Sequence, residues 1–298
     1  MVEPRMRRPV ILDTDIGTDV DDILALVLLA QAPEVRLIAV TTVYGDTQLR
    51  ARMTRHVLDR MGRSDVPVGI GASETLTGRP VWWAGHEGQD IPDLDQVQVD
   101  ASNTAIDLLH QAAREHRGNL DLFAIGPLTN VAEAITADDS FTASLHHLYI
   151  MGGAFWTERP EHNIKCDPEA ADIVFRSGIP ITACGLDVTE RVWLRETDLP
   201  RIREAADGIG TLLEGQVRRW WAFKGENANQ LHDPLAVLPA IRPELFRFDQ
   251  CDVRIELNSH EPGRTLLDLC GEGAVRIAAD VEVEAAEQEI IRRLVEHG

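Results

Sequence analysis

Five aspartates lie within ten residues near the start of the chain: Asp13, Asp15, Asp19, Asp21 and Asp22. Carboxylates this close together repel one another unless a positive charge lies among them. Hard cations such as Ca²⁺ and Mg²⁺ take oxygen ligands, so a bound cation is the simplest explanation for the cluster. Helix capping by one of these residues would explain that aspartate and leave the others unexplained.

Three further segments carry groups that suit the same chemistry. His232-Asp233-Pro234 opens a predicted helix, and it offers another carboxylate beside the side chain that titrates nearest neutrality. If Glu161 to Asn163 is extended, a carboxylate and an amide point to one side, an arrangement that suits sugar hydroxyls. The carbonyl of Ile125, at the end of an apolar strand, is a candidate cation ligand. Each signal taken alone is also typical of an ordinary helix cap or turn.

Apolar runs and amphipathic stretches alternate along the chain and indicate the elements that position these residues. We expect strands at 10–13, 35–41, 66–70, 120–125, 148–151 and 179–183. We expect helices at 21–32, 48–61, 102–116, 128–136 and 167–176. This alternation predicts an α/β fold, with an open, mostly parallel Rossmann-like sheet and helices on both faces.

The rest of the chain adds a mainly helical part at 197–241, a late hairpin at 254–257 and 264–269, and a closing helix at 283–296. The segment 73–100 is rich in loops, as binding loops often are. No linker divides the sequence, so we expect one domain spanning residues 1–298.

Composition limits the partners. The 298 residues include 49 acidic and 29 basic side chains, a formal net charge of -20. This excess of acid argues against nucleic-acid and anionic-membrane partners, since both require basic surfaces. Four widely spaced cysteines without a CxxC pair indicate neither a zinc site nor a disulfide framework. No apolar run suits a transmembrane helix or a signal peptide, so we expect a cytoplasmic protein.

Taken together, the motifs resemble those of the inosine–uridine-type nucleoside hydrolase family. The resemblance rests on ordered matches at 13–17, 21–22, 41–46, 125–130, 151–153, 161–171, 186–189 and 232–234. It implies hydrolysis of the N-glycosidic bond of ribonucleosides to free base and ribose, using a Ca²⁺-bound water. It also implies a homodimer or homotetramer. A purine-leaning or broad base preference is our hypothesis.

The resemblance also implies roles for individual residues. The calcium ligands would be Asp15, Asp22, Asp233 and the carbonyl of Ile125. Asp15 would also be the base that takes a proton from the attacking water. The ribose contacts would be Asp21, Glu161 and Asn163. His232 would lie beside the leaving base as its proton donor.

The sequence departs from the family pattern at two places in the site. The acidic loop is two residues longer than the commonest form, which leaves Asp19 without a role. Asp46 stands where many members carry asparagine, and we expect it beside the attacking water and the substrate. The pairs Trp82-Trp83 in the loop-rich segment and Trp220-Trp221 on a helix predicted at 207–223 are candidates to stack on the base. Among them we expect Trp83 and Trp221, together with His86, to contact the substrate. Tryptophan pairs on helices more often belong to the core.

Two alternatives remain open at this point. A haloacid-dehalogenase-type phosphatase also places an Asp-x-Asp motif after a strand, but that class needs a phosphate-binding lysine downstream. Only Lys165 and Lys224 are available, and neither follows a strand in the matching way. The second alternative is a non-catalytic or weakly active ribonucleoside-binding protein on the same scaffold.

Overall fold

The computed structural model describes residues 7–205, 208–258, 261–268 and 273–296. Within them, one nine-stranded sheet has the spatial order β10-β9-β11-β6-β5-β4-β1-β2-β3, and two short strands, β7 and β8, pair outside it. The strands are β1 (Arg8–Thr14), β2 (Val35–Thr42), β3 (Val68–Ile70), β4 (Leu120–Ala124), β5 (Leu145–Met151), β6 (Ile181–Cys184), β7 (Trp193–Arg195), β8 (Ala228–Gln230), β9 (Phe246–Ile255), β10 (Thr265–Asp268) and β11 (Val275–Val281).

Strands from β11 to β3 in this order run parallel, whereas β9 and β10 add an antiparallel edge. Strand β1 lies in the interior of the sheet, between β4 and β2. Its residues Val10, Ile11 and Leu12 are fully buried. A parallel strand covered by helices on both faces must be apolar on both sides, which is why this run does not alternate with polar residues.

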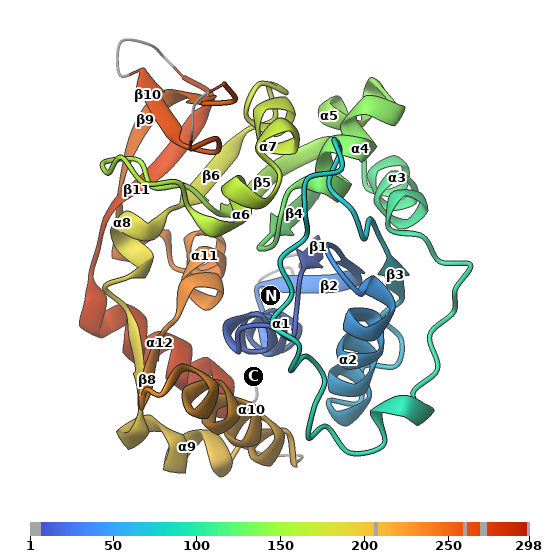
Figure 1. Ribbon diagram of the computed structural model, residues 1–298, viewed down its shortest axis with the longest axis vertical. Coiled ribbons are helices and arrows are strands. Elements are labelled where there is room, and N and C mark those ends of the chain that lie inside the picture. The colour runs from blue at the N-terminus through green and yellow to red at the C-terminus, as the bar shows by residue number, and fades with distance from the viewer. Residues whose placement is uncertain (1–6, 206–207, 259–260, 269–272, 297–298) are drawn as a thin grey trace, which may run out of the picture.

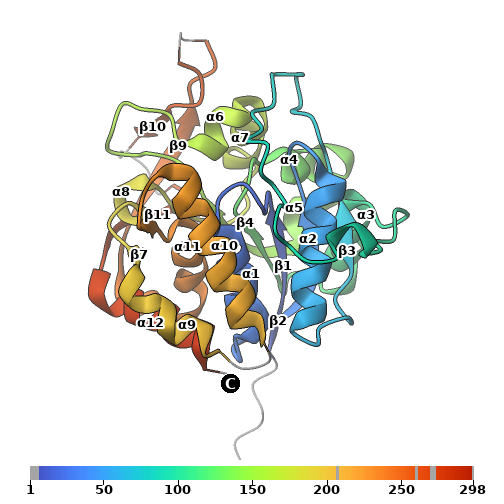
Figure 2. The same cartoon turned by 60° about the horizontal axis from the view of Figure 1, so that its bottom comes forward.

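Helices cover both faces of the sheet and form one hydrophobic core on each (Figures 1 and 2). One core includes α1, α2, α10, α11 and α12, and the other includes α3, α4 and α7. No helix in the described ranges is long and apolar enough to cross a membrane. The helices are α1 (Asp21–Gln31), α2 (Thr47–Arg60), α3 (Ala105–Glu115), α4 (Thr129–Ala137), α5 (Ser140–Ser144), α6 (His162–Cys166), α7 (Pro168–Phe175), α8 (Leu186–Thr189), α9 (Leu199–Arg203), α10 (Ile209–Lys224), α11 (His232–Ile241) and α12 (Val283–Val295).

The predicted α/β class and mostly parallel sheet are confirmed, and every predicted strand overlaps an observed one. The late hairpin exists as β9 and β10, but β9 already begins at Phe246, and the predicted Leu269 lies outside the described residues. Residue 207, the expected start of a helix, also lies outside them. Strand β11 was not predicted. Its place depends on tertiary pairing, because it joins β6 in parallel and β9 in antiparallel register.

The order of the strands fixes where a site can form. The chain winds outward from β1 to β2 and β3, and then returns to place β4 on the other side of β1. A crevice opens beyond the carboxyl ends of two such strands, at the switch point of an open α/β sheet. Asp15 follows β1 at this point and Ile125 follows β4. The segment 73–100, irregular except for the short helix η1 (Leu94–Gln96), contributes residues to the same end of the sheet.

Candidate active site

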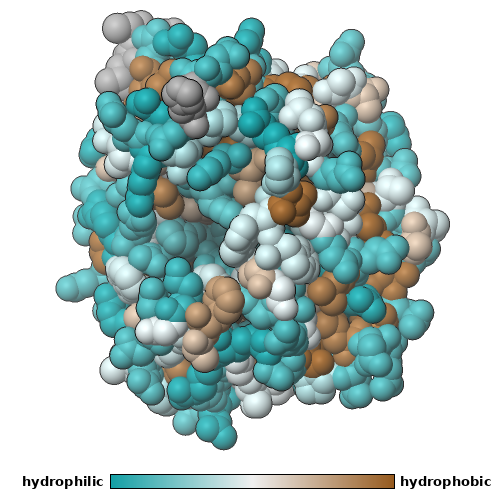
Figure 3. All heavy atoms as spheres, in the orientation of Figure 1, coloured by the Kyte–Doolittle hydropathy of each residue, from teal (hydrophilic) through white to brown (hydrophobic). Residues whose placement is uncertain are grey.

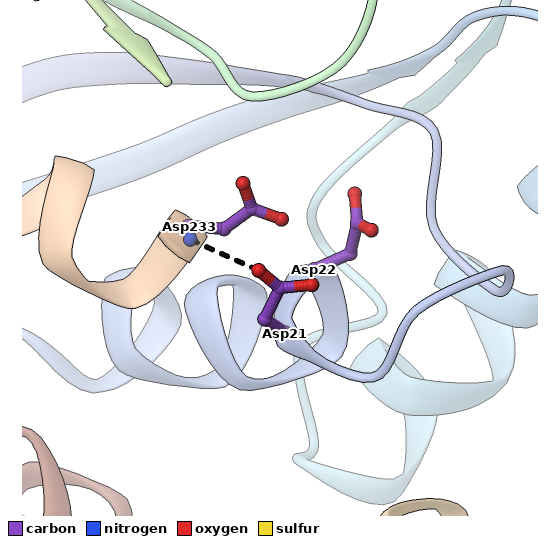
Figure 4. Close-up of side chains that lie close together, drawn as sticks. All are labelled: Asp21, Asp22 and Asp233. Carbon is purple, nitrogen blue, oxygen red and sulfur yellow. Dashed lines mark hydrogen bonds between the residues drawn. The ribbon is translucent and has the colours of Figure 1, made fainter. Parts of the chain in front are cut away.

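Three aspartates meet at this switch point. Asp21 and Asp22 open α1, and Asp233 lies in the first turn of α11. One oxygen of each lies within 4.8 Å of the others, and all three residues are buried. Figure 4 shows the three side chains converging, with the backbone N–H of Asp233 donating to Asp21 Oδ2 at 3.2 Å. Burial, together with repulsion from neighbouring carboxylates, raises the pKa of each well above its ordinary value.

Asp15 lies beside this group and contributes to the same electrostatic field. Its charge raises the pKa of Asp21, Asp22 and Asp233. The expected carboxylate ligands were Asp15, Asp22 and Asp233, whereas the trio described above consists of Asp21, Asp22 and Asp233. The structure therefore brings four carboxylates to the site. Oxygen atoms at this density suit a hard cation.

Ile125 lines the same cavity, and its carbonyl already accepts a hydrogen bond. Asn163 Nδ2 donates to it at 2.8 Å and to the carbonyl of Met151 at 3.1 Å. A carbonyl oxygen has two lone pairs, so one remains for a cation. Asn163 therefore joins the ends of β4 and β5 while it lines the cavity.

Glu161 is extended, but His162 and Asn163 already belong to α6, so the condition under which Glu161 and Asn163 would point to one side of a strand is not met. Glu161 caps α6, and its carboxylate accepts the backbone N–H groups of Asn163 (2.8 Å), Ile164 (3.1 Å) and Gly153 (3.2 Å). Capping supplies acceptors for N–H groups that the first turn of a helix leaves free, and this outweighs the extended conformation. Both Glu161 and Asn163 still line the cavity.

His232 lines the cavity as well, with Nδ1 2.8 Å from the Thr189 hydroxyl. Burial lowers the pKa of His232 to about 4. The imidazole is therefore neutral at pH 7, and its second nitrogen is a donor when Nδ1 accepts from Thr189.

Asp13 and Asp46 do not line the cavity. Asp13 is fully buried behind the site, where Thr41 and Asn130 donate to its Oδ1, and burial raises its pKa to about 7. Asp46, which we expected beside the substrate, is exposed and caps α2 by accepting from the backbone N–H of Leu49 at 2.9 Å. A short acidic side chain at a helix start satisfies that N–H, which turns it away from the site.

The aromatic contacts differ from our expectation in both tryptophan pairs. Trp82 and Trp220 line the cavity, whereas Trp83 covers the guanidinium of Arg50 at 4.9 Å. Trp221 belongs to the core, and its Nε1–H donates to Asn229 at 2.7 Å. Neighbouring residues on a helix point about 100° apart, so only one of that pair can face the site.

His86 was also expected to contact the base, but it does not line the cavity either. Its Nε2 lies 2.8 Å from the carbonyl of Thr18, and its ring packs against Trp220 and Phe223. His86 therefore connects the loop-rich segment to the lengthened acidic loop and to α10.

The cavity has a volume of about 700 Å³, which accommodates a nucleoside. A hollow near the middle of the molecular face is visible in Figure 3. Besides the residues described above, the walls of the cavity include Thr18, Asp19, Tyr44, Arg79, Pro80, His162, Lys165, Cys166, Leu186 and Pro262. Asp19, to which the sequence assigned no role, therefore lies at the site, and burial raises its pKa to about 7.

Sequence reasoning missed Arg50, which is buried beneath the acidic loop. A signal was available, because Arg50 shares the buried face of α2 with Met53, Thr54 and Val57 at helical spacing. Arginine on such a face needs polar partners close by. Sequence reasoning also missed Thr14, which donates to Asp22, and Thr189, which contacts His232. Threonines that serve such roles show no distinctive spacing in the sequence.

An open α/β sheet with a carboxylate-lined cavity at its switch point defines an α/β enzyme whose site suits a hard cation. The particular family follows from sequence, since the model of the inosine-uridine preferring nucleoside hydrolases matches residues 10–288. The chain belongs to this family and is a nucleoside hydrolase, an enzyme that cleaves N-glycosidic bonds. This membership displaces the phosphatase alternative.

Similar proteins agree with this assignment. The pyrimidine-specific ribonucleoside hydrolase RihA of Photobacterium profundum is 34% identical over 282 residues, which cover 88% of this chain and 89% of the relative. Uridine nucleosidase 1 of Arabidopsis thaliana is 33% identical over 274 residues, covering 87% and 81%. A solved plant nucleoside hydrolase is 29% identical with a TM-score of 0.87, covering 97% of this chain and 99% of that one.

Proposed function

We propose that this enzyme hydrolyses pyrimidine ribonucleosides to free base and ribose, with Ca²⁺ as its metal. The observation that carries the proposal is the convergence of Asp21, Asp22 and Asp233 at a cavity large enough for a nucleoside. Buried carboxylates at such distances are costly unless a cation compensates them. Ca²⁺ accepts many oxygen ligands in flexible geometry, which suits carboxylates and a carbonyl from separate elements.

The residues that would hold the cation are Asp15, Asp22, Asp233 and the carbonyl of Ile125. Asp21 lies close enough to share this role or to bind a ribose hydroxyl. When bound, Ca²⁺ would lower the pKa of a coordinated water. Asp15 accepts the proton of the attacking water as general base. The surrounding carboxylates stabilise the positive charge that develops on the ribose as the glycosidic bond breaks.

His232 assists the departure of the base in this proposal. In the tautomer whose Nδ1 accepts from the Thr189 hydroxyl, the neutral imidazole donates a hydrogen bond through its other nitrogen. A neutral donor stabilises charge developing on the base without first taking up a proton from solvent. Asn163 and Glu161 lie at the cavity wall where ribose hydroxyls would bind, although most of the hydrogen-bonding capacity of Glu161 serves the cap of α6.

We propose pyrimidine rather than purine preference for two reasons. The purine hypothesis rested on the pairs Trp82-Trp83 and Trp220-Trp221, and one member of each pair, Trp83 and Trp221, does not line the cavity. The relatives at 33–34% identity described above are named as a pyrimidine-specific hydrolase and a uridine nucleosidase. Trp82 and Trp220 take over as the candidate surfaces on which a base stacks.

The test is kcat/KM for uridine, cytidine, inosine and adenosine, measured by release of reducing sugar before and after chelation and after readdition of Ca²⁺. We expect uridine or cytidine to exceed both purine nucleosides by at least about 10-fold, a difference of roughly 1.4 kcal/mol in transition-state binding. Faster turnover of inosine would refute the base preference, and full activity after chelation would refute the metal. Binding without release of ribose would favour the non-catalytic alternative. The homodimer or homotetramer stays a prediction that light scattering would check.

A further inference from the structure

Arg50 is an almost completely buried arginine on α2, with 1% of its surface exposed. Burying a guanidinium is costly unless its N–H groups find acceptors and nearby negative charge. Among the described residues, the other side chains that rank as the largest fully buried ones are apolar or aromatic. Arg50 thus requires a specific explanation, which its contacts supply.

The guanidinium donates hydrogen bonds to two segments of backbone behind the acidic cluster. Nη1 donates to the carbonyls of Asp15 and Ile16, the latter at 2.8 Å, and Nε donates to the carbonyl of Tyr44 at 2.7 Å. Nη2 reaches the Thr18 hydroxyl at 3.3 Å. A planar fork of five N–H donors is suited to bridging several acceptors at once.

The charge of Arg50 also reaches the site. Nη2 lies 3.9 Å from Asp15 Oδ2, and the guanidinium lowers the pKa of Asp22, against the larger effect of burial. The ring of Trp83 covers the guanidinium at 4.9 Å. Arg50 therefore places a permanent positive charge and a rigid fork directly behind a loop whose carboxylates repel one another.

We propose that Arg50 is the positioning residue of the acidic loop. It anchors the backbone at residues 15–18 so that the Asp15 carboxylate stays beside the aspartate trio and is preorganised for the cation and the attacking water. The inference rests on the proposed function for its catalytic consequence. The anchoring itself is a property of the metal-free protein and can be measured without metal or substrate.

The experiment compares Arg50→Met and Arg50→Lys with Arg55→Met as matched control. Arg55 lies on the same helix and donates to the carbonyls of Val66 and Arg63, away from the site. The first readout is hydrogen exchange of segment 14–20 in the metal-free protein. The second is Ca²⁺ affinity by calorimetry, and the third is kcat and KM separately.

We expect hydrogen exchange of segment 14–20 to accelerate at least about 10-fold in Arg50→Met. Ca²⁺ affinity and kcat should each fall about 10- to 100-fold, which is the loss typical when a residue that supports a metal ligand is removed. KM should change less than kcat, because Arg50 does not line the cavity. Lysine keeps the charge but lacks the fork, so Arg50→Lys should fall between wild type and Arg50→Met. Arg55→Met should leave all three readouts within about twofold.

Unchanged exchange of segment 14–20 in Arg50→Met, or equal losses in Arg55→Met, would overturn the proposal. If Arg50→Met does not fold, Arg50→Lys decides by the same readouts. Failure of the proposed function is separate, because it would appear as absent turnover or absent Ca²⁺ binding in the wild-type enzyme while the exchange result still stands.

Discussion

Replacing Asp233 with asparagine should stabilise the metal-free protein while removing its activity. The carboxylates of Asp21, Asp22 and Asp233 have oxygens within 4.8 Å of one another. At that separation and an effective dielectric constant of about 20, two full charges repel by about 3.5 kcal/mol. Asparagine has nearly the same volume and removes one member of the trio, and its amide can donate to a remaining carboxylate.

The net gain must be smaller than the full repulsion. The raised pKa values of the trio mean that protonation already relieves part of it. The asparagine variant also loses the favourable interaction of the Asp233 charge with the N-terminus of α11, which contributes about 0.5 kcal/mol. We therefore expect a gain of about 1–2 kcal/mol in the free energy of unfolding, or a rise in Tm of about 2–3 °C.

The assay is thermal unfolding in chelator and again in Ca²⁺, beside kcat for the best nucleoside. Ca²⁺ at 100 times its Kd should stabilise the wild-type protein by about 2.7 kcal/mol and the variant far less. Turnover should fall by about 100-fold or more. The matched control is Asp121→Asn, a buried aspartate that accepts from His146 at 2.7 Å and pairs with Arg8 at 3.4 Å, where the same substitution should lower Tm.

A lower Tm for metal-free Asp233→Asn than for wild type would refute the repulsion argument. An undiminished Ca²⁺ shift in this variant would refute the place of Asp233 at the metal site. Stability and activity are expected to move in opposite directions here, as they do where a site holds groups that destabilise the fold.

Three further predictions concern neighbouring residues. Asp15→Ala should fold and lose about 10²–10⁴-fold in kcat, since general-base catalysis contributes that much; near-normal turnover would exclude Asp15 as the base. His232→Ala should slow natural nucleosides more than a nitrophenyl riboside, whose leaving group needs no assistance, and equal losses would remove His232 from this step. Burial raises the pKa of Asp13 from 3.8 to about 7, so in the metal-free protein its proton is held more tightly in the folded state, and stability should fall as pH rises from about 4 to 7. Asp13→Asn should flatten that decline in denaturant unfolding, and an unchanged slope would place the titration elsewhere.

The sequence alone determined the fold class and the end of the sheet where the site lies. Apolar runs such as Val10 to Leu12, which alternate with helical patterns, favour interior parallel strands, and polar residues directly after such strands collect at one edge of the sheet. The acidic cluster could also be predicted from the sequence, because the local spacing of its aspartates already brings their carboxylates together. Family resemblance then added Asp233, which is distant in sequence, to the same site.

Tertiary structure decided which side chains face the cavity. Trp82 and Trp220 face it instead of Trp83 and Trp221, because packing against Arg50 and the core fixes the direction of each pair. Asp46 caps a helix instead of facing the substrate. Arg50 is placed behind the acidic loop by its hydrogen bonds to the carbonyls of Asp15, Ile16 and Tyr44. The type and spacing of residues report which chemistry is available. Their orientation depends on partners far along the chain, which only the folded structure brings together.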